Sequence, residues 1–157
     1  MEKKWIQALG KMTYGIYVLT TTYEDEINGM IASWVSQISY DPPLVMAAIH
    51  PHRYSHRLIE QSGSFALHIL AQDQGEFLSR FKGDDPRLKF DGVRWEKSKT
   101  GCPILRDCIA FAECTVNAVY RPGNHTLYVG EIVDANCNSD DHPLTTLDYS
   151  GQYLGKS

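Results

Sequence analysis

Two strand-like segments flank a single tight turn, and this hairpin pattern constrains the fold more than any other feature. In residues 111–120, the apolar residues Ala112, Cys114 and Val116 alternate with polar residues such as Glu113. This alternation predicts a strand with one buried and one polar face. Residues 121–124 contain a Pro-Gly pair typical of β-turns, and 125–134 reads as the returning strand. The segment therefore predicts antiparallel sheet.

The rest of the chain also predicts strands in hairpin-like succession, with few helices. Strands are predicted at 15–23, 27–38, 43–49 and 65–70, helices at 54–61 and 73–81 with Asp73 as N-cap, and a charged loop at 82–99. A closed or half-closed antiparallel barrel is favoured, because closure removes exposed sheet edges. A length of 157 residues predicts one domain, 1–157.

Charge and composition limit the possible partners. Fifteen basic against nineteen acidic residues give a net charge of −4, which argues against nucleic acid or an anionic membrane and leaves a small ligand open. No apolar run is long enough to cross a bilayer and no signal peptide is evident, so a cytoplasmic location is expected. The four cysteines lack C-x-x-C spacing and are predicted to be buried or semi-buried thiols.

The segment from Asn28 to Ser36 places glycine, alanine and serine in a strand that packing alone would fill with larger residues. Small residues let a ligand approach the backbone closely. A bulge or a barrel corner, with Trp34 in the core, explains the composition equally well.

The segment from His50 to Arg57 follows a buried strand and enters a helix. Helix-start N–H groups, a serine hydroxyl and two guanidinium groups suit a phosphate. A solvated loop is an alternative, and so is a metal held by His50, His52 and His56. The metal is disfavoured, because the segment has no acidic or cysteine ligand.

His125 follows the Pro-Gly turn at the mouth of a strand, where an imidazole can bind a ligand or titrate near neutral pH. No nucleophile elbow, P-loop or dinucleotide fingerprint is evident. A small-residue strand, an anion loop and a histidine together favour a protein that holds a phosphorylated cofactor.

Four motifs in order resemble one family. They are 28–36 continuing to 40–45, Ser55-His56, 63–70, and 123–131, and the likeness runs from about Lys11 to Tyr153, including an aromatic tail at 148–153. The sequence resembles the flavin reductase-like FMN-binding split-barrel family, and within it the flavoredoxin branch.

The resemblance implies a mainly β, Greek-key split barrel that forms homodimers, with FMN near the interface and NADH or NADPH as hydride donor. Position by position, it implies that one stretch lines the flavin, that a second group holds the phosphate, and that His125 lies beside the flavin and nicotinamide in a catalytic role. The implied flavin-lining residues are Asn28, Gly29, Met30, Ile31, Ala32, Ser33, Trp34 and Ser36. The implied phosphate-end residues are His50, Arg53, Ser55, His56 and either Lys82 or Lys89.

Two departures from the family pattern, Trp34 and His56, favour the flavoredoxin branch, whose members pass electrons to proteins. The expected activity is hydride transfer from NAD(P)H through FMN to free flavin or to a rubredoxin-like or monooxygenase partner. A flavoredoxin-like electron carrier or redox sensor without NAD(P)H turnover is the alternative. A barrel for a ligand other than flavin is a third, weaker hypothesis.

Overall fold

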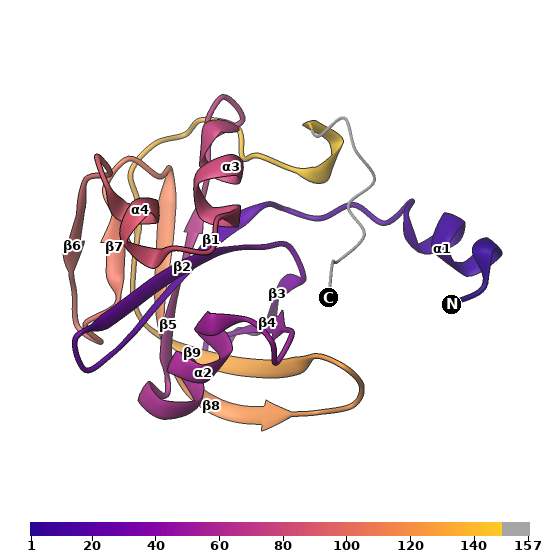
Figure 1. The fold of residues 1–157 in the computed structure, drawn as a ribbon, viewed down its shortest axis with the longest axis horizontal. Coiled ribbons are helices and arrows are strands. Elements are labelled where there is room, and N and C mark those ends of the chain that lie inside the picture. Colours follow the sequence, from indigo (N-terminus) through magenta and orange to yellow (C-terminus); the bar gives the residue numbers. More distant parts are fainter. Residues whose placement is uncertain (149–157) are drawn as a thin grey trace.

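The computed structural model describes residues 1–148, and a curved sheet of seven strands forms its centre (Figure 1). The seven strands are β1 (Tyr17–Tyr23), β2 (Glu26–Ala32), β3 (Val35–Ser39), β4 (Leu44–Ile49), β5 (Ser64–Ile69), β8 (Ala110–Tyr120) and β9 (Thr126–Cys137). A separate two-stranded sheet contains β6 (Trp95–Lys97) and β7 (Pro103–Leu105). The helices are α1 (Lys3–Leu9), α2 (Tyr54–Ser62), α3 (Glu76–Lys82), α4 (Pro86–Phe90) and the 3₁₀ turn η1 (Thr146–Asp148). Most of the predicted aromatic tail lies outside the described residues.

The order of the strands explains how the sheet becomes a barrel. It is β2-β1-β5-β8-β9-β4-β3, with every neighbouring pair antiparallel. The two edge strands, β2 and β3, are consecutive in the chain and are joined by only Ser33 and Trp34. The sheet therefore curls until its edges approach each other at this linker, where the Trp34 carbonyl accepts a hydrogen bond from the Ala48 amide at 2.9 Å. The predicted mainly β split barrel is confirmed.

Strand β2 separates two apolar layers. Met30 and Ala32 pack with the barrel interior around Phe65 and Tyr128, whereas Ile31 packs on the other side. That second layer holds Phe77 and Phe81 of α3, Phe90 of α4 and Leu105 of β7. Alternate residues of β2 therefore face different layers, as strand geometry requires.

The β8–β9 hairpin is present as predicted, but its alternation has one important exception. Glu113, expected on the polar face, is fully buried. Its carboxylate accepts hydrogen bonds from the Lys99 and Thr100 amides and from the Thr100 hydroxyl, at 3.2, 2.6 and 2.6 Å. The register also shifts between Glu113 and Cys114. This side chain anchors the loop between β6 and β7, a long-range role that alternation does not reveal.

The prediction of one strand over 27–38 is wrong. The chain pairs with β1 until Ala32, leaves the sheet at Ser33 and Trp34, and resumes at the opposite edge as β3 beside β4. Barrel closure imposes this break, because one straight strand cannot lie on both edges.

The prediction of a loop over 82–99 is also wrong in part, because α4 and β6 lie within it. Pro86 occupies the start of α4, and the Asp85 carboxylate accepts a hydrogen bond from the Arg87 amide at 2.9 Å, a typical N-cap. Phe90 then buries the helix against the second apolar layer. Helix α3 begins at Glu76, with Gly75 rather than Asp73 as N-cap.

The cysteines agree with prediction except at one position, because Cys102, Cys108 and Cys114 are buried whereas Cys137 is exposed. Within residues 1–148, no helix combines the length and apolar character needed to cross a membrane.

Candidate functional site

Strand β2 supplies the first wall of the site. A Cβ on Gly29 would lie 2.6 Å from Cε1 of Phe81, so glycine here permits the close packing of α3. Asn28 is 2% exposed and its side chain points toward α2 and α4, where it makes two hydrogen bonds. The small residue at 29 thus has a packing explanation, while the polar residue beside it is directed at the site.

The linker after β2 carries Trp34, which lies at one end of a row of aromatic rings that continues with three imidazoles from other segments. The Trp34 and His125 ring centroids are 4.6 Å apart, His125 and His50 are 5.1 Å apart, and His50 and His52 are 4.8 Å apart. We call these four residues the ring cluster. It brings the β2–β3 linker, the end of β4 and the tip of the β8–β9 hairpin to one place.

His125 is held in one tautomer by its neighbour. Its Nδ1 lies 2.8 Å from Oδ1 of Asn124, an acceptor, so Nδ1 carries the hydrogen and Nε2 is the acceptor in the neutral ring. Burial, followed by the nearby charges of His50 and Arg53, lowers the pKa of His125. The imidazole is therefore neutral at pH 7, with Nε2 able to accept a proton or a hydrogen bond.

The start of α2 forms the second part of the site. Arg53 is the N-cap residue, but no side chain caps the helix, and no acidic residue lies in the first turn. Ser55 is fully buried in that turn, and its Oγ accepts a hydrogen bond from Nδ2 of Asn28 at 2.9 Å. Uncapped N–H groups and the helix dipole favour an anion at this position.

Lys89 brings a buried positive charge to the same place. It is 6% exposed, and its Nζ donates to Oδ1 of Asn28 at 3.0 Å and to the Gly29 carbonyl at 2.9 Å. Burial is the largest influence on its pKa, which is lowered; Arg53 acts in the same direction, while Asp84 opposes it. We call Arg53, Ser55, Lys89 and the first turn of α2 the anion site.

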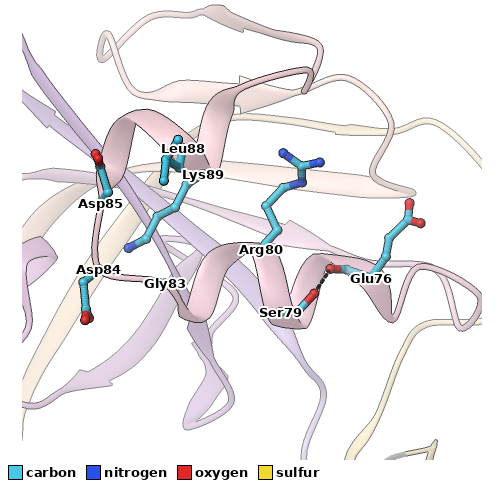
Figure 2. A pocket seen from close by; sticks show the side chains of 8 residues that line it. All are labelled: Glu76, Ser79, Arg80, Gly83, Asp84, Asp85, Leu88 and Lys89. Carbon is cyan, nitrogen blue, oxygen red and sulfur yellow. Dashed lines mark hydrogen bonds between the residues drawn. The ribbon is translucent and has the colours of Figure 1, made fainter.

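A cavity of about 530 Å³ opens between α3 and α4 on the other side of Lys89 (Figure 2). Figure 2 shows Lys89 reaching from α4 into the space between the helices, toward the side where Asp84 and Asp85 lie, whereas Arg80 extends in another direction. Leu88 and Ser79 complete much of the wall. Lys89 is thus shared between this cavity and the anion site.

Arg53 links the anion site with the ring cluster. Its charge contributes to the lowered pKa of Lys89 in the anion site and to that of His125 in the ring cluster. The two groups therefore belong to one region of the molecule, with cationic and hydroxyl groups at one end and aromatic rings at the other.

His56 ties α2 to β9. Its Nε2 lies 2.8 Å from Oγ1 of Thr126, and its ring packs edge-on against Tyr128 at 5.4 Å. Burial chiefly lowers the pKa of His56, although the nearby Glu60 carboxylate acts in the opposite direction. Its Nε2 is occupied, so Nδ1 is the atom left for a ligand, and the predicted phosphate contact stays a prediction.

Not all of the predicted residues direct side chains to the site. Ile31 packs into the second apolar layer, and Ser36 is exposed with its hydroxyl bonded to the Gln37 carbonyl. Met30 and Ala32 pack into the barrel interior. The side chains of Ile31 and Ala32 are buried, Met30 is half-buried, and Ser33 is buried in the linker.

Sequence reasoning missed several residues that position the site. Asn124 orients His125, and Thr126 binds His56. Glu60 accepts hydrogen bonds from Tyr128 at 2.6 Å and from Arg121 at 2.8 and 3.0 Å, which fastens α2 to the hairpin. The role of Asn124 could have been inferred, because it lies next to His125 directly after the Pro-Gly turn. The other pairings join residues far apart in sequence, which local patterns do not reveal.

The described residues contain no group of three or more His, Cys, Asp or Glu side chains arranged to hold a metal ion. The ring cluster has three imidazoles, yet they pack on one another at tilted and edge-on angles.

Fold and site together define an antiparallel barrel in which a helix start that no side chain caps lies in one region with buried Lys89 and a group of aromatic rings. This arrangement suits a phosphorylated aromatic cofactor. The chain belongs to the flavin reductase like domain family, whose model matches residues 9–156. The predicted family is therefore confirmed.

Known relatives agree with this assignment. The chain is 31% identical over 149 residues to the high molecular weight rubredoxin of Moorella thermoacetica, covering 91% of this chain but only 64% of that longer protein. It is 32% identical to the FMN reductase (NADH) SmoA of Agrobacterium fabrum, over 99% of this chain and 86% of SmoA. The structure of nitrilotriacetate monooxygenase component B from Mycobacterium thermoresistibile is similar with a TM-score of 0.83 and 30% identity, over 91% of this chain and 80% of that one.

Proposed function

We propose that this protein is an NAD(P)H:flavin oxidoreductase that holds the phosphate of FMN at the anion site and the flavin ring beside the ring cluster. One observation carries the proposal: Ser55, Arg53 and Lys89 converge on a helix start that no side chain caps, next to Trp34 and His125. Family membership and the activity in the name of SmoA support the same function.

The residues present fit a phosphorylated flavin. The ammonium of Lys89 is almost fully buried and donates to two neutral oxygens, of Asn28 and Gly29. The carboxylates of Asp84 and Asp85 act on this ammonium from the cavity side. A phosphate dianion at the start of α2 would add an opposite charge on the other side of Lys89, which favours a buried cation. The ring cluster offers aromatic faces and edges, with which a planar ring system can stack.

FMN supplies the redox chemistry when bound, as acceptor of a hydride from the nicotinamide. The protein contributes position and charge. The backbone of β2 and of the Ser33–Trp34 linker would line the flavin ring, and Trp34, which packs on His125, would bound it at the barrel edge. His125 presents Nε2 as a neutral acceptor, so it can orient a ligand donor or hold a proton at that atom.

The electron acceptor that we propose is free flavin or a separate redox protein. The relative from Moorella thermoacetica is named a rubredoxin, and the solved relative is a component of a monooxygenase. A rubredoxin-like or monooxygenase partner is consistent with both names, and the net charge of −4 leaves acidic surface for such a contact.

We also infer that residues 1–157 work as one flavin-binding domain within a homodimer. Helix α1 projects from the barrel and none of its residues is buried (Figure 1). Trp5, Leu9 and Met12 are 52, 49 and 54% exposed. A second copy of the chain that covers these apolar side chains accounts for their exposure on one projecting helix and the segment after it.

Purified protein titrated with FMN tests the function directly. We expect saturable binding, followed under anaerobic conditions by bleaching of the bound flavin's visible absorption on addition of NADH or NADPH within turnover time. If dithionite reduces the bound flavin but neither NADH nor NADPH does, the protein is an electron carrier instead. Protein that takes up no FMN contradicts both.

His125→Ala is expected to reduce kcat/KM for NAD(P)H oxidation by about tenfold, because an interaction at Nε2 in the transition state is worth about 1.4 kcal/mol. The dissociation constant of FMN should change much less, since the phosphate end is separate. Steady-state kinetics and FMN titration measure the two quantities. His142→Ala, which removes an exposed imidazole outside the ring cluster, is the matched control. An equal loss in FMN affinity and in kcat/KM would assign His125 to cofactor binding.

A further inference from the structure

Three buried polar side chains from three separate elements form a hydrogen-bonded chain behind the anion site. Nζ of Lys89 in α4 donates to Oδ1 of Asn28 in β2 at 3.0 Å, and Nδ2 of Asn28 donates to Oγ of Ser55 in α2 at 2.9 Å. Their exposures are 6, 2 and 0%. Asn28 and Ser55 therefore have little access to water, and the direction of the hydrogen bond between them is set by groups of the protein.

The ammonium at one end fixes the direction of the whole chain. Lys89 can only donate, so the amide of Asn28 must turn its oxygen to Lys89 and its NH₂ group to Ser55. The second hydrogen bond of Lys89, to the Gly29 carbonyl at 2.9 Å, holds the ammonium in place. Ser55 then accepts at Oγ, and its own hydroxyl hydrogen is directed away from Asn28.

The hydroxyl of Ser55 lies in the first turn of α2, where no side-chain acceptor caps the helix. Its hydrogen thus lies beside the backbone N–H groups of the first turn, which no side chain caps, although the His56 amide donates to the Arg53 carbonyl at 3.0 Å. A serine free to rotate could present a lone pair to an incoming anion, whereas this serine presents a donor.

We propose that Lys89 is a positioning residue: acting through Asn28, it fixes Ser55 as a hydrogen-bond donor, so that the start of α2 selects a phosphate dianion over a flavin without phosphate. This inference rests on the proposed function. It assigns to Lys89 and Asn28 a role behind Ser55, because Asn28 lies between the Lys89 ammonium and the Ser55 hydroxyl in the hydrogen-bonded chain.

A direct ionic contact between Lys89 and the phosphate is the competing explanation. It requires the third hydrogen of the Lys89 ammonium, because the other two are already directed to Asn28 and Gly29. The two explanations differ in how the effects of Lys89 and Ser55 combine. Acting on the same donor, the two residues are coupled; acting as separate contacts, they are independent.

The experiment is a double-mutant cycle measured by quenching of FMN fluorescence, with riboflavin as the phosphate-free probe. We expect Ser55→Ala and Lys89→Met each to weaken FMN binding by about tenfold, the usual effect of one hydrogen bond to a charged group. The double variant should bind FMN about as weakly as Ser55→Ala alone. Riboflavin affinity should stay within about twofold throughout, which a general structural effect would not allow.

Two further variants keep the test decisive if Lys89→Met does not fold. Lys89→Arg retains a group that only donates, and should retain most of the FMN affinity. Asn28→Asp keeps the hydrogen bond to Lys89 but accepts the hydroxyl hydrogen of Ser55, so its effect should be smaller in the Ser55→Ala background than in the parent. Lys97→Met, at an exposed lysine of β6, is the charge control.

Each outcome has one meaning. Losses for Lys89→Met and Ser55→Ala that multiply in the double variant would overturn the inference and leave the proposed function intact. If Asn28→Asp weakens FMN binding by the same factor in the parent and in the Ser55→Ala background, the inference is likewise overturned and the proposed function stays intact. Parent protein that binds FMN no more tightly than riboflavin would overturn the inference. Parent protein that binds neither flavin would overturn the proposed function together with it.

Discussion

Glu113→Ala should lower the free energy of unfolding by about 2–4 kcal/mol. The substitution leaves at least two buried or half-buried donors without an acceptor, and each unsatisfied donor costs about 1–3 kcal/mol. The carboxylate now accepts from the Lys99 and Thr100 amides and the Thr100 hydroxyl. No other hydrogen-bond partner of these two amides is known in residues 1–148. Loss of the anchor releases the β6–β7 loop from the main sheet.

Urea unfolding of the variant beside the parent measures this effect. Glu113→Gln keeps one acceptor oxygen and should lose less than Glu113→Ala. Glu96→Ala is the matched control, because Glu96 is exposed and its ion pair with Arg106 is worth less than about 1 kcal/mol. If Glu113→Ala and Glu96→Ala cost the same, the buried carboxylate does not anchor the loop.

Local patterns in the sequence predict most of the framework. The β8–β9 hairpin follows from alternation around a Pro-Gly turn, and α2 ends at Gly63 in the left-handed conformation that glycine favours. The anion loop before α2 was also recognisable, because arginine, serine and a helix start occur together in a short segment. Each of these features depends on residues within about ten positions of one another.

The features that sequence reasoning missed depend on distant residues. The break at Ser33 and Trp34 follows from barrel closure, and the burial of Glu113 follows from a loop more than ten residues away. The composition around Gly29 left open whether its small size makes room for a ligand or for packing, and the structure places the Phe81 ring against it. The local sequence of β2 cannot reveal that a side chain of α3 fills the space beside Gly29.

The same limit applies within the site. Lys89 lies 61 positions from Asn28, in a segment predicted to be loop, and its burial depends on α4 packing over β2. Family resemblance brought Lys89 into consideration beside Lys82, but only the three-dimensional arrangement separates them: Lys89 is buried on Asn28, and Lys82 is exposed at the end of α3. Topology, rather than residue type, decides which lysine serves the anion site.

Acid should destabilise this protein through one buried histidine in β5. His68 is fully buried, and its Nδ1 donates to the Val18 carbonyl at 3.0 Å, which leaves Nε2 without a partner among the described residues. Burial lowers the pKa of His68 to about 4, although the Val18 carbonyl and the charge of Glu113 act in the opposite direction. The folded protein therefore keeps this ring neutral well below pH 6.5.

The sign of the effect follows from proton binding. Between pH 6.5 and about 4 the unfolded chain takes up a proton at His68 and the folded chain does not, so the free energy of unfolding falls as the pH falls. Over this interval the loss reaches about 3 kcal/mol at about 1.4 kcal/mol per pH unit. Above pH 6.5 the contribution is complete, and below about 4 it no longer changes, because both states are protonated.

His68→Gln removes the titrating group while a side-chain amide can still donate to the Val18 carbonyl. Its free energy of unfolding, measured in urea from pH 7.5 to pH 4, should fall by about 3 kcal/mol less than that of the parent. Carboxylates that titrate in the same interval are common to both proteins, so the difference isolates His68. His142→Gln, which removes an exposed imidazole, should keep the full acid-dependent loss. Parallel pH profiles for His68→Gln and the parent would mean that the folded barrel accommodates a charged His68, for instance by admitting water to Nε2.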